Sequence, residues 1–412
     1  MTAAPSYPHD LFTDEMLTDP YEHYRALRDL GPVVWLDAHG MYAVARYAEA
    51  RAILADPGTY CSGQGVALND TANTIAAGRN VLMTDGKLHE HLRRVLAHNL
   101  TPRALGAVGD KVQQAAAHLV ATLVARGSFD AVTDLATALP LTIVPDLVGW
   151  PEQAREHLLE WASATFDLLG PLNERARSAV PRSQAMFAFA DETAATGNLL
   201  PGSVGAGVIE AAKRGELEPD RVAPLIVGYL APSLDTTISA IGSAVWLLAR
   251  HPDQWAALRA NPSLVPNAFA ETLRLESPLR AFSRVTTAAV RIGAVDLPAG
   301  ARVVVLFAAA NRDERHFRRP DEFDITRPNA TGHLGFGYGV HSCAGQGLAR
   351  MEAHALLTAL AAQAERLELT RPATPVLNNL INARATVPVA VTPDRIATSG
   401  PADSHDQEVA SP

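Results

Sequence analysis

The sequence predicts a mainly α-helical protein with small β-sheet regions, organised as a single domain over residues 1–396. Three observations lead to this prediction. Apolar residues make up 48% of the 412 residues, which is enough for a large core. Long segments place apolar residues at helical spacing. Short segments rich in β-branched residues, bounded by turn residues, occur towards the two ends of the chain.

Helical spacing accounts for most of the chain. The first helix, over residues 20–30, ends at Gly31-Pro32, and Pro102 interrupts a helical stretch over residues 89–126. The residues from 397 to 412 are rich in Ser, Asp, Pro and Gly and are expected to form a disordered tail. Further helices are expected over 47–54, 153–169, 219–250, 253–260, 264–276 and 346–367, and strands over 33–36, over 41–44 and within 283–307.

Charge and cysteine content exclude several classes of protein. A formal net charge of −9 disfavours nucleic acid as a partner, because phosphate backbones require a basic surface. The two cysteines, Cys61 and Cys343, provide neither a disulfide framework nor a four-thiolate zinc site. The first twelve residues lack a signal-peptide pattern, and there is no uninterrupted run of about 18 apolar residues. We therefore expect a cytoplasmic protein that does not interact with a membrane.

A glycine-rich loop surrounds Cys343 and is the strongest chemical feature of the sequence. It reads Gly335-Phe-Gly-Tyr-Gly-Val-His-Ser-Cys-Ala-Gly345. The glycines allow a tight loop whose N–H groups point towards the sulfur. The helix that follows is expected to lower the pKa of the thiol. Phe336 is placed to shield the sulfur, and Ala344 and Gly345, which have little or no side chain, leave room for a flat macrocycle. The alternative is a buried core cysteine.

The pattern Phe336-x-x-Gly339-x-x-x-Cys343-x-Gly345 resembles the haem-ligand signature of the cytochromes P-450. Three further motifs follow the order of that family, and together they span residues 85–350. The resemblance implies a single triangular α-rich domain with the cytochrome P-450 fold. It also implies haem b, with Cys343 as the iron ligand and with Phe336 and Gly345 in the cofactor site.

Two charged residues on one predicted helix carry the second motif. Glu271 and Arg274 are three residues apart, so they share a helix face. Taken alone, they are equally consistent with a surface ion pair of little value. The resemblance implies a buried triad completed by Arg327, with a structural role in fixing the cysteine loop.

The resemblance also implies four contacts to the haem propionates. His89 and Arg93 lie one helical turn apart, whereas the other two residues come from distant segments. A carboxylate clamp needs several converging charge-assisted hydrogen bonds. The alternative for each residue alone is a solvated surface charge. The four expected contacts are His89, Arg93, Arg284 and His341.

The helix expected over residues 219–250 is apolar nearly all round and should be buried, yet it contains Asp235 and Thr236. The resemblance assigns these two residues as the acid and the alcohol that activate oxygen: Thr236 hydrogen-bonds the oxygen, and Asp235 relays protons from solvent. The alternative is that Thr236 only bonds back to a carbonyl one turn earlier. Pro232-Ser233 departs from the small residues usual in the family, and we expect Pro232 to produce the kink of this helix.

The sequence is similar to bacterial members that O-demethylate para-substituted methoxyaromatics. It has Gln64, Val227, Gly228 and Ala231 where members acting on methoxybenzoates carry a carboxylate anchor. A buried carboxylate without a partner is very costly, so we expect a neutral substrate, with an alkylguaiacol as the leading candidate. The expected pocket walls, each of which is equally consistent with ordinary core, are Val66, Leu68, Phe166, Leu169, Leu230, Ala231, Leu279 and Phe282.

The chain contains no flavin or iron–sulfur motif, so the electrons must come from outside. We expect a monomer served by a ferredoxin or flavodoxin and an NAD(P)H-dependent reductase, with O2 as co-substrate. Three alternatives stay open: a hydroxylase of another small hydrophobic or natural-product substrate, a peroxide-driven peroxygenase, and a non-enzymatic haem-binding sensor or carrier. The Asp235-Thr236 pair argues against the last two.

Overall fold

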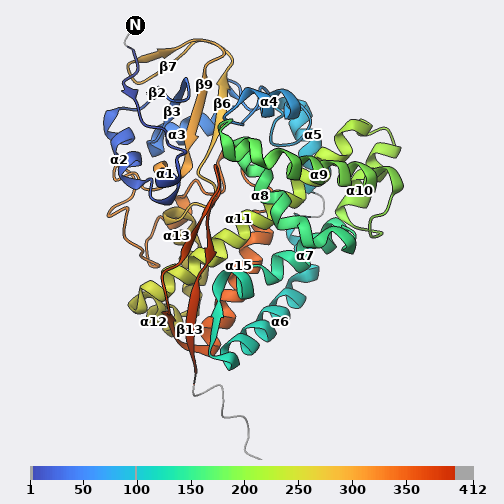
Figure 1. The fold of residues 1–412 in the computed structure, drawn as a ribbon, viewed down its shortest axis with the longest axis vertical. Helices are drawn as coiled ribbons and strands as arrows, with labels where there is room; N and C mark the ends of the chain where they lie inside the picture. The colour runs from blue at the N-terminus through green and yellow to red at the C-terminus, as the bar shows by residue number, and fades with distance from the viewer. Residues whose placement is uncertain (1–2, 98–99, 395–412) are drawn as a thin grey trace, which may run out of the picture.

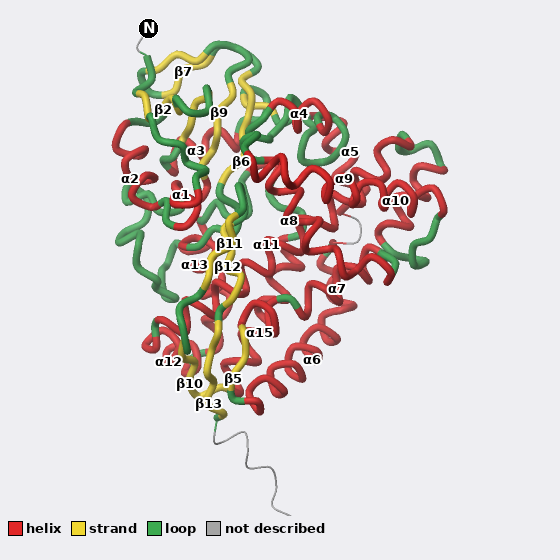
Figure 2. Tube along the Cα trace, in the orientation of Figure 1, coloured by secondary structure: helices red, strands yellow, loops and turns green. Residues whose placement is uncertain are grey.

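The computed structural model describes residues 3–97 and 100–394, so the tail expected at 397–412 lies outside the described residues. The outline is triangular, with helices filling most of the body and strands gathered along one side (Figures 1 and 2). This arrangement confirms the prediction of a mainly helical fold with small sheets.

Helix α11, Val222–Arg250, runs through the centre of the molecule (Figure 1). Its residues are apolar on almost every side, which a helix tolerates only when other elements surround it. Two stretches, Ala131–Val148 and Pro219–Arg250, are long and apolar enough to cross a membrane, but 72% of the apolar window of the second is buried inside the fold. A core position therefore accounts for the apolar character of α11. Its packing partners are α7 (Ala138–Val148), α8 (Leu158–Leu169), α9 (Glu174–Thr196), α13 (Val265–Leu275) and α15 (Gln346–Gln363).

The remaining helices surround this centre. Side-chain caps start several of them: Asn69, Asn173 and Ser203 each accept a hydrogen bond from a backbone N–H in the first turn of α4, α9 and α10. These other helices are α1 (Asp14–Thr18), α2 (Tyr21–Leu30), α3 (Tyr47–Ala55), α4 (Asp70–Ala76), α5 (Gly86–Ala97), α6 (Pro102–Arg126), α10 (Val204–Lys213), α12 (Pro252–Ala260) and α14 (Phe307–Ala310).

The largest sheet has the strand order β1-β2-β3-β9-β6-β4. In it, β6 pairs antiparallel with β9, and β4 pairs with the other edge of β6 so that Cys61 lies opposite Val285. Its strands are β1 (Ser6–Tyr7), β2 (Val34–Leu36), β3 (Met41–Val44), β9 (Arg302–Leu306), β6 (Ala281–Thr286) and β4 (Tyr60–Cys61).

Three smaller sheets complete the β structure. One has the order β10-β13-β5, and the other two are the hairpins β11-β12 and β7-β8. The turn of the first hairpin, residues 378–381, lies against α8, because Asn378 donates a hydrogen bond to the Ser163 carbonyl. Their strands are β10 (Ala364–Leu369), β13 (Pro388–Pro393), β5 (Ser128–Asp130), β11 (Thr374–Leu377), β12 (Asn382–Thr386), β7 (Val290–Ile292) and β8 (Val295–Leu297).

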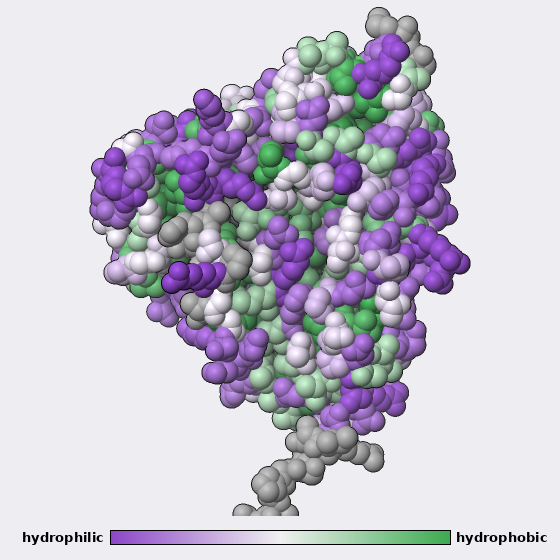
Figure 3. Space-filling view, turned by 180° about the vertical axis from the view of Figure 1, so that it is seen from behind, coloured by the Kyte–Doolittle hydropathy of each residue, from purple (hydrophilic) through white to green (hydrophobic). Residues whose placement is uncertain are grey.

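The surface mixes hydrophilic and apolar residues. Seen from behind, hydrophilic residues cover both flanks, and paler, more hydrophobic residues lie between them (Figure 3). Isolated apolar residues on a surface are normal and do not by themselves indicate an interface. Among the described residues, the exposed large hydrophobic side chains are Leu30, Ile75, Leu172, Leu200, Val340 and Leu377.

Some expected elements need correction. The last helix ends at Gln363 rather than at residue 367, because the following residues form β10 and pair with β13. The helix expected over 153–169 begins as a 3₁₀ helix, Glu152–His157, before α8. Helices α7, α9 and α10 were not predicted.

Candidate active site

The loop around Cys343 is tightly folded and fixed to its surroundings. Gly337 and Gly339 adopt positive φ angles of 69° and 73°, which favour glycine. A Cβ atom on Gly339 would lie 2.4 Å from the Leu54 carbonyl oxygen, so any larger residue would push the loop away from α3. Inside the loop, the Cys343 N–H donates to the Phe336 carbonyl at 2.8 Å. The backbone therefore determines where the sulfur lies.

The environment of the thiol differs from the expectation in one respect. Burial raises the pKa of Cys343, while hydrogen bonds from the backbone of Gly345 and Gln346 and the charges of Arg93 and Arg350 lower it. The overall shift is upward, although the helix start lowers the pKa of the free thiol as expected. The helix terminus does act in the expected direction, but burial outweighs it.

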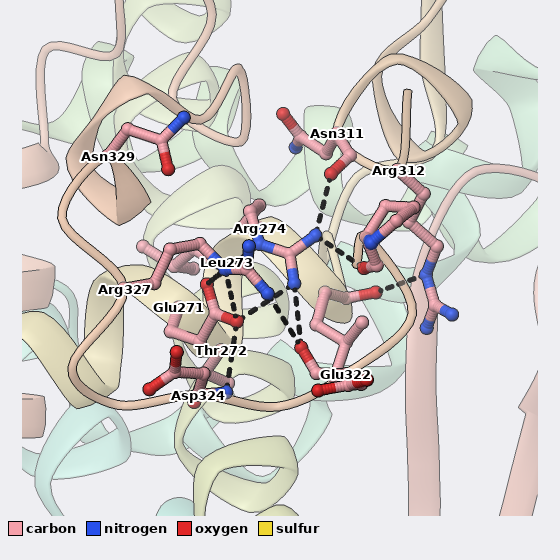
Figure 4. Close-up of polar contacts among 12 residues, drawn as sticks. Glu271, Thr272, Leu273, Arg274, Asn311, Arg312, Glu322, Asp324, Arg327 and Asn329 are labelled. Carbon is pink, nitrogen blue, oxygen red and sulfur yellow. Dashed lines mark hydrogen bonds and ion pairs between the residues drawn. The ribbon is translucent and has the colours of Figure 1, made fainter. Parts of the chain in front are cut away.

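The structure brings Glu271, Arg274 and Arg327 together, as predicted (Figure 4). The Glu271 carboxylate accepts from Arg274 Nε at 2.7 Å and from Arg327 Nε at 2.9 Å. Glu271 and Arg274 are fully buried, and Arg327 is 4% exposed. The interpretation as a surface ion pair is therefore excluded. Two positive charges share one buried carboxylate, which makes this a network rather than a pair.

The network is connected to the cysteine loop through Asn311. Arg274 donates to the Asn311 carbonyl at 2.9 Å, and the Asn311 side-chain oxygen accepts from the Leu334 N–H at 2.6 Å. Leu334 directly precedes the loop. The buried charges thus hold the segment from which the loop starts, in keeping with the structural role expected for them.

Four residues expected to bind propionates lie close to Asp85. The rings of His89 and His341 are 4.2 Å apart, and His341 Nε2 is 3.2 Å from an Asp85 carboxylate oxygen. Arg93 donates to the Ser342 carbonyl at 2.8 Å. Burial lowers the pKa of Arg284 to about 10, and the negative charge of nearby Asp85 opposes this shift. Three separate segments of the chain therefore bring basic groups to one place.

These basic groups fit an anionic ligand. His89 is 3% exposed, and its Nε2 atom has no hydrogen-bond partner among the described residues. Its pKa is lowered to about 4, chiefly by burial and then by His341 and Arg93. Arg284 is 4% exposed and donates to the carbonyl of its neighbour Ser283. Buried donors of this kind are costly unless a partner satisfies them, and the carboxylates of haem would do so.

The cysteine loop approaches α11 at Gly345 and Ser233. Although the fold surrounds it, Cys343 is exposed, so free volume adjoins its side chain. A Cβ atom on Gly345 would lie 4.0 Å from Cys343 Sγ and 4.0 Å from Ser233 Oγ. The sulfur and the hydroxyl are therefore at most twice that distance apart. Cys343 would hold haem beside this part of α11.

One stripe of α11 faces free volume. Gly228 and Pro232 are exposed, and Asp235 and Thr236 are partly exposed, although most of the helix is buried. These positions follow one another at intervals of about four residues and so share a helix face. The stripe lies on the same helix as Ser233, which borders the cysteine loop. The predicted acid and alcohol therefore both belong to this stripe, although the Asp235 carboxylate itself is buried and hydrogen-bonds Ser163 of α8.

The alcohol and the acid differ in how they are held. Thr236 donates to the Pro232 carbonyl at 2.6 Å, which is the back-bonded arrangement considered as the alternative. Asp235 Oδ2 is buried and has no hydrogen-bond partner among the described residues. Burial and, less strongly, the charge of Asp167 raise the pKa of Asp235 to about 7, against a hydrogen bond with Ser163 that lowers it. Asp235 therefore titrates near neutral pH, as a proton relay requires.

The expected pocket walls fall into two groups. Val66, Leu68, Phe166 and Phe282 belong to one buried apolar cluster, with Leu169 and Leu279 packed against it. Backbone hydrogen bonds join these segments: Leu68 N–H donates to the Leu169 carbonyl at 2.8 Å, and Ser283 N–H to the Val66 carbonyl at 2.8 Å. Leu230 and Ala231 lie instead in a second cluster, with residues of α5, α7, α9 and α10. The structure therefore places six of the eight expected wall residues in or against one apolar cluster.

Sequence reasoning missed several polar residues of this region. Asp85 hydrogen-bonds His341, Ser163 hydrogen-bonds Asp235, and Asn311 accepts from Arg274. The charge of Asp167 acts on Asp235. Only Asp167 had a recognisable signal, because it is an acid beside Phe166 on a helix with an otherwise apolar face. The other three acquire their roles through contacts between distant parts of the chain.

Comparison with known proteins gives consistent matches. A family model described as cytochrome P450 matches residues 138–363. The chain is 40% identical over 392 residues to cytochrome P450 CYP199A2 of Rhodopseudomonas palustris, covering 94% of this chain and 95% of that protein. It is 32% identical over 382 residues to the cyclomarin C epoxidase CymV of Salinispora arenicola, covering 90% and 94%.

Solved structures agree over nearly the whole fold. CalO2 superimposes with a TM-score of 0.81 at 28% identity, covering 94% of this chain and 99% of that one. Cytochrome P450 CREJ, in complex with (4-ethylphenyl) dihydrogen phosphate, gives a TM-score of 0.81 at 25% identity, covering 91% and 98%. The arrangement of helices and sheets is therefore shared along more than nine-tenths of the chain.

Proposed function

Because this chain belongs to the cytochrome P450 family and is a haem-dependent monooxygenase, we propose that it acts on a small neutral aromatic. The proposed reaction is the oxidative O-demethylation of an alkyl-methoxyphenol, with alkylguaiacols as the leading substrates. One atom of O2 enters the methoxy carbon as a hydroxyl group, and the other leaves as water with two protons and two electrons. The resulting hemiacetal then breaks into a catechol and formaldehyde.

Haem, iron protoporphyrin IX, supplies the redox chemistry when bound. Cys343 would hold the iron through its sulfur, and Phe336 and Gly345 would shape the loop around it. The buried triad would fix the starting point of that loop. The propionates would be bound by His89, Arg93, Arg284 and His341.

On the α11 side of the haem site, Asp235 would supply protons, and the Thr236 hydroxyl would donate the final hydrogen bond to oxygen. Proton supply requires the Thr236 hydroxyl to exchange its bond to the Pro232 carbonyl for one to the reacting oxygen. Its neighbour Asp235 is partly exposed on the same stripe of α11. The acid is adjacent to the alcohol in the sequence, and its carboxylate hydrogen-bonds Ser163 of α8.

The neutrality of the proposed substrate depends on one observation, the uncharged lining at the positions of the family's carboxylate anchor. Gly228 is exposed, and a Cβ there would meet only the Asn80 Cβ, at 3.9 Å. Arg302 reaches the neighbouring loop but is engaged by the Gly65 and Ala67 carbonyls and by Asp70. A carboxylate entering this region would lose its hydration without gaining a charged partner. The ligand of CREJ, (4-ethylphenyl) dihydrogen phosphate, supports a para-substituted aromatic of this size, but it carries an ionisable phosphate and so gives no support to neutrality.

Members of the family need a redox partner, and this chain has no motif for a second redox centre. We propose a ferredoxin or flavodoxin with an NAD(P)H-dependent reductase, acting on a monomer in the cytoplasm. Turnover with NAD(P)H and partners, compared with turnover on peroxide alone, separates this proposal from a peroxygenase.

Spectroscopy of the iron ligand tests the foundation of the proposal. The reduced protein with carbon monoxide should show the red-shifted Soret band of thiolate ligation. Cys343→Ser should lose that band, whereas Cys61→Ser, which alters the other cysteine, should keep it. A band typical of histidine ligation in the unchanged protein would contradict the assignment of Cys343.

Substrate binding tests the proposal that the substrate is a neutral aromatic. Alkylguaiacols should shift the spin state of the iron at lower concentration than methoxybenzoates of the same size. Gln64→Arg should improve methoxybenzoate binding about tenfold, since a charge-assisted bond adds roughly 1.4 kcal/mol or more. Gln64→Met, similar in length but uncharged, is the matched control. Tight binding of methoxybenzoate to the unchanged protein would overturn the neutral-substrate proposal.

A further inference from the structure

We propose that Asn73 and Arg302 set the size selectivity of the enzyme by fixing the backbone at Ala67. The inference rests on the proposed function, in which the neighbours of Ala67 in the chain, Val66 and Leu68, face a small aromatic substrate. Asn73 and Arg302 act through the backbone and not on the substrate, so they are positioning residues. They leave the chemistry of the reaction unchanged and determine which molecules fit.

The Ala67 carbonyl accepts three hydrogen bonds from side chains. They come from Asn73 Nδ2 at 3.0 Å, from Ser283 Oγ at 3.0 Å and from Arg302 Nη1 at 3.1 Å. The Ala67 N–H in turn donates to Asn73 Oδ1 at 2.9 Å, so both polar groups of this residue are engaged. A carbonyl oxygen has two lone pairs, which three converging donors occupy fully. Side chains from α4, β6 and β9 thus determine the position of Ala67.

The segment around Ala67 is irregular and buried, so its backbone needs such partners. Residues 65–69 belong to no helix or strand, and residues 65–68 are all buried. Arg302 Nη1 also donates to the Gly65 carbonyl at 3.3 Å. Gly65 has a φ angle of 100°, and a Cβ atom there would lie 2.1 Å from Asn73 Oδ1. Glycine therefore allows the segment to approach Asn73 this closely.

The same segment connects two parts of the proposed active site. Just before it, the Gly63 N–H donates to Asp85 at 2.6 Å, and Asp85 lies beside His341 of the cysteine loop. At the other end of the segment, Asn69 Nδ2 donates to the Leu168 carbonyl near the end of α8 at 2.7 Å. Fixing the middle of the segment therefore positions one wall between the haem site and α8.

Arg302 uses its charge mostly on neutral acceptors. Its side chain is 17% exposed, whereas that of its acidic partner Asp70 is 93% exposed. An ion pair with so exposed a partner contributes little. The bonds to backbone carbonyls, and one to Ser283 Oγ at 3.0 Å, therefore account for most of the attachment of the guanidinium. An apolar residue would avoid the cost of desolvating a charge here, so the guanidinium is best explained by the segment that it holds.

A wall that is fixed before binding changes how ligands of different size bind. Val66 is fully buried and Leu68 is 4% exposed, and both belong to the apolar cluster that includes Phe166 and Phe282. Such a wall needs no ordering when the ligand arrives, and it resists displacement by a larger ligand. One misfitting methylene group in an apolar pocket lowers affinity by about 10- to 200-fold. Loosening the wall should therefore weaken the best ligand and admit larger ones.

The binding test compares Arg302→Met with Arg291→Met, which removes an arginine that also pairs with an aspartate but is 68% exposed. N-alkylimidazoles of increasing chain length are the probes, because their free nitrogen binds haem iron whatever the natural substrate is. Visible spectroscopy of the haem-loaded protein gives each dissociation constant. In the unchanged protein and in Arg291→Met, one methylene beyond the best fit should weaken binding about tenfold or more. In Arg302→Met the same step should cost less than about threefold.

Hydrogen exchange in the absence of any ligand tests the attachment itself. The amides of residues 66–68 should exchange about tenfold faster in Arg302→Met and in Asn73→Leu, because each variant removes a hydrogen bond from the Ala67 carbonyl. Arg291→Met should leave these rates unchanged. If Arg302→Met does not fold, Arg302→Lys keeps the charge but has a single nitrogen, and the same direction of change is expected.

Faster exchange together with a flatter chain-length series supports the proposal. Unchanged exchange would show that Asn73 and Arg302 do not hold the segment, and faster exchange with an unchanged series would show that they hold it for stability alone. Either result overturns the proposal. The imidazole series also separates this inference from the proposed function. If alkylguaiacols do not shift the spin state while the series flattens as expected, the proposed substrate is wrong and the positioning roles stand.

Discussion

Glu271→Gln is expected to lower the free energy of unfolding by about 3–5 kcal/mol, the usual consequence of removing one partner from a buried ion pair. The variant leaves Arg274 and Arg327 buried without a countercharge. Their remaining bonds go to backbone carbonyls, which do not neutralise them. Denaturant unfolding monitored by circular dichroism would measure the loss. Weaker retention of haem should accompany it, because the cysteine loop starts from the segment that the network holds.

Glu210→Gln provides the control. Glu210 pairs with Lys213 at the same three-residue spacing, but both side chains are more than half exposed. Exposed pairs contribute little, so this variant should unfold like the unchanged protein. Equal stability of Glu271→Gln and Glu210→Gln would show that the buried network does not support the fold.

Asp235→Asn is expected to slow oxygen activation by about 10²- to 10⁴-fold, the range typical of a positioned acid or base. NAD(P)H consumption, product and peroxide measured together would show whether oxygen is still bound but no longer used productively. The pH dependence of the unchanged enzyme near pH 7 should disappear in the variant, because asparagine does not titrate. Asp191→Asn, which removes an exposed acid from α9, serves as the control. A full rate in Asp235→Asn would contradict the role assigned to Asp235.

Asp235→Asn should also change the free energy of unfolding, and the change should depend on pH. The folded-state pKa of Asp235 is raised from 3.8 to about 7, so its contribution to stability is fully present below about pH 4 and is lost as pH rises through 7. Asparagine avoids that loss. At pH 8 the variant should therefore be more stable than the unchanged protein by about 2 kcal/mol. This is roughly half of the free energy that the pKa shift implies, since the partial exposure of Asp235 weakens the effect. Near pH 4 the difference should vanish.

Local patterns explain what the sequence predicted well. The cysteine loop and the Glu271–Arg274 pair are short motifs, in which a few adjacent residues specify the geometry. Helix α11 was predicted because its apolar character extends over its whole length. The expected elements around 20–54 also hold closely, since α2 ends at Leu30 before Gly31 and α3 begins at Tyr47.

Tertiary contacts explain most of what was missed. Pro145 lies inside α7 and Pro181 inside α9, and proline within a segment argues against a helix when packing is unknown. The end of α15 is set by pairing of β10 with β13, which propensity does not reveal. The roles of Asp167 and Asn311 depend on partners far away in the sequence. The direction of the thiol pKa shift depended on burial, which a local motif does not report.

The contacts of the buried arginines have a consequence for evolution and for engineering. Arg274 donates to the carbonyls of Asn311, Pro320 and Glu322, and Arg327 donates to those of Arg318 and Arg319. Every residue type supplies a carbonyl, so the part of this segment over residues 318–322 is held largely through its backbone. Its outward-facing residues are consequently free to change while its path stays the same. Substitution libraries in this segment should be unusually tolerant, which makes it a suitable place to vary the surface of the enzyme without disturbing its interior.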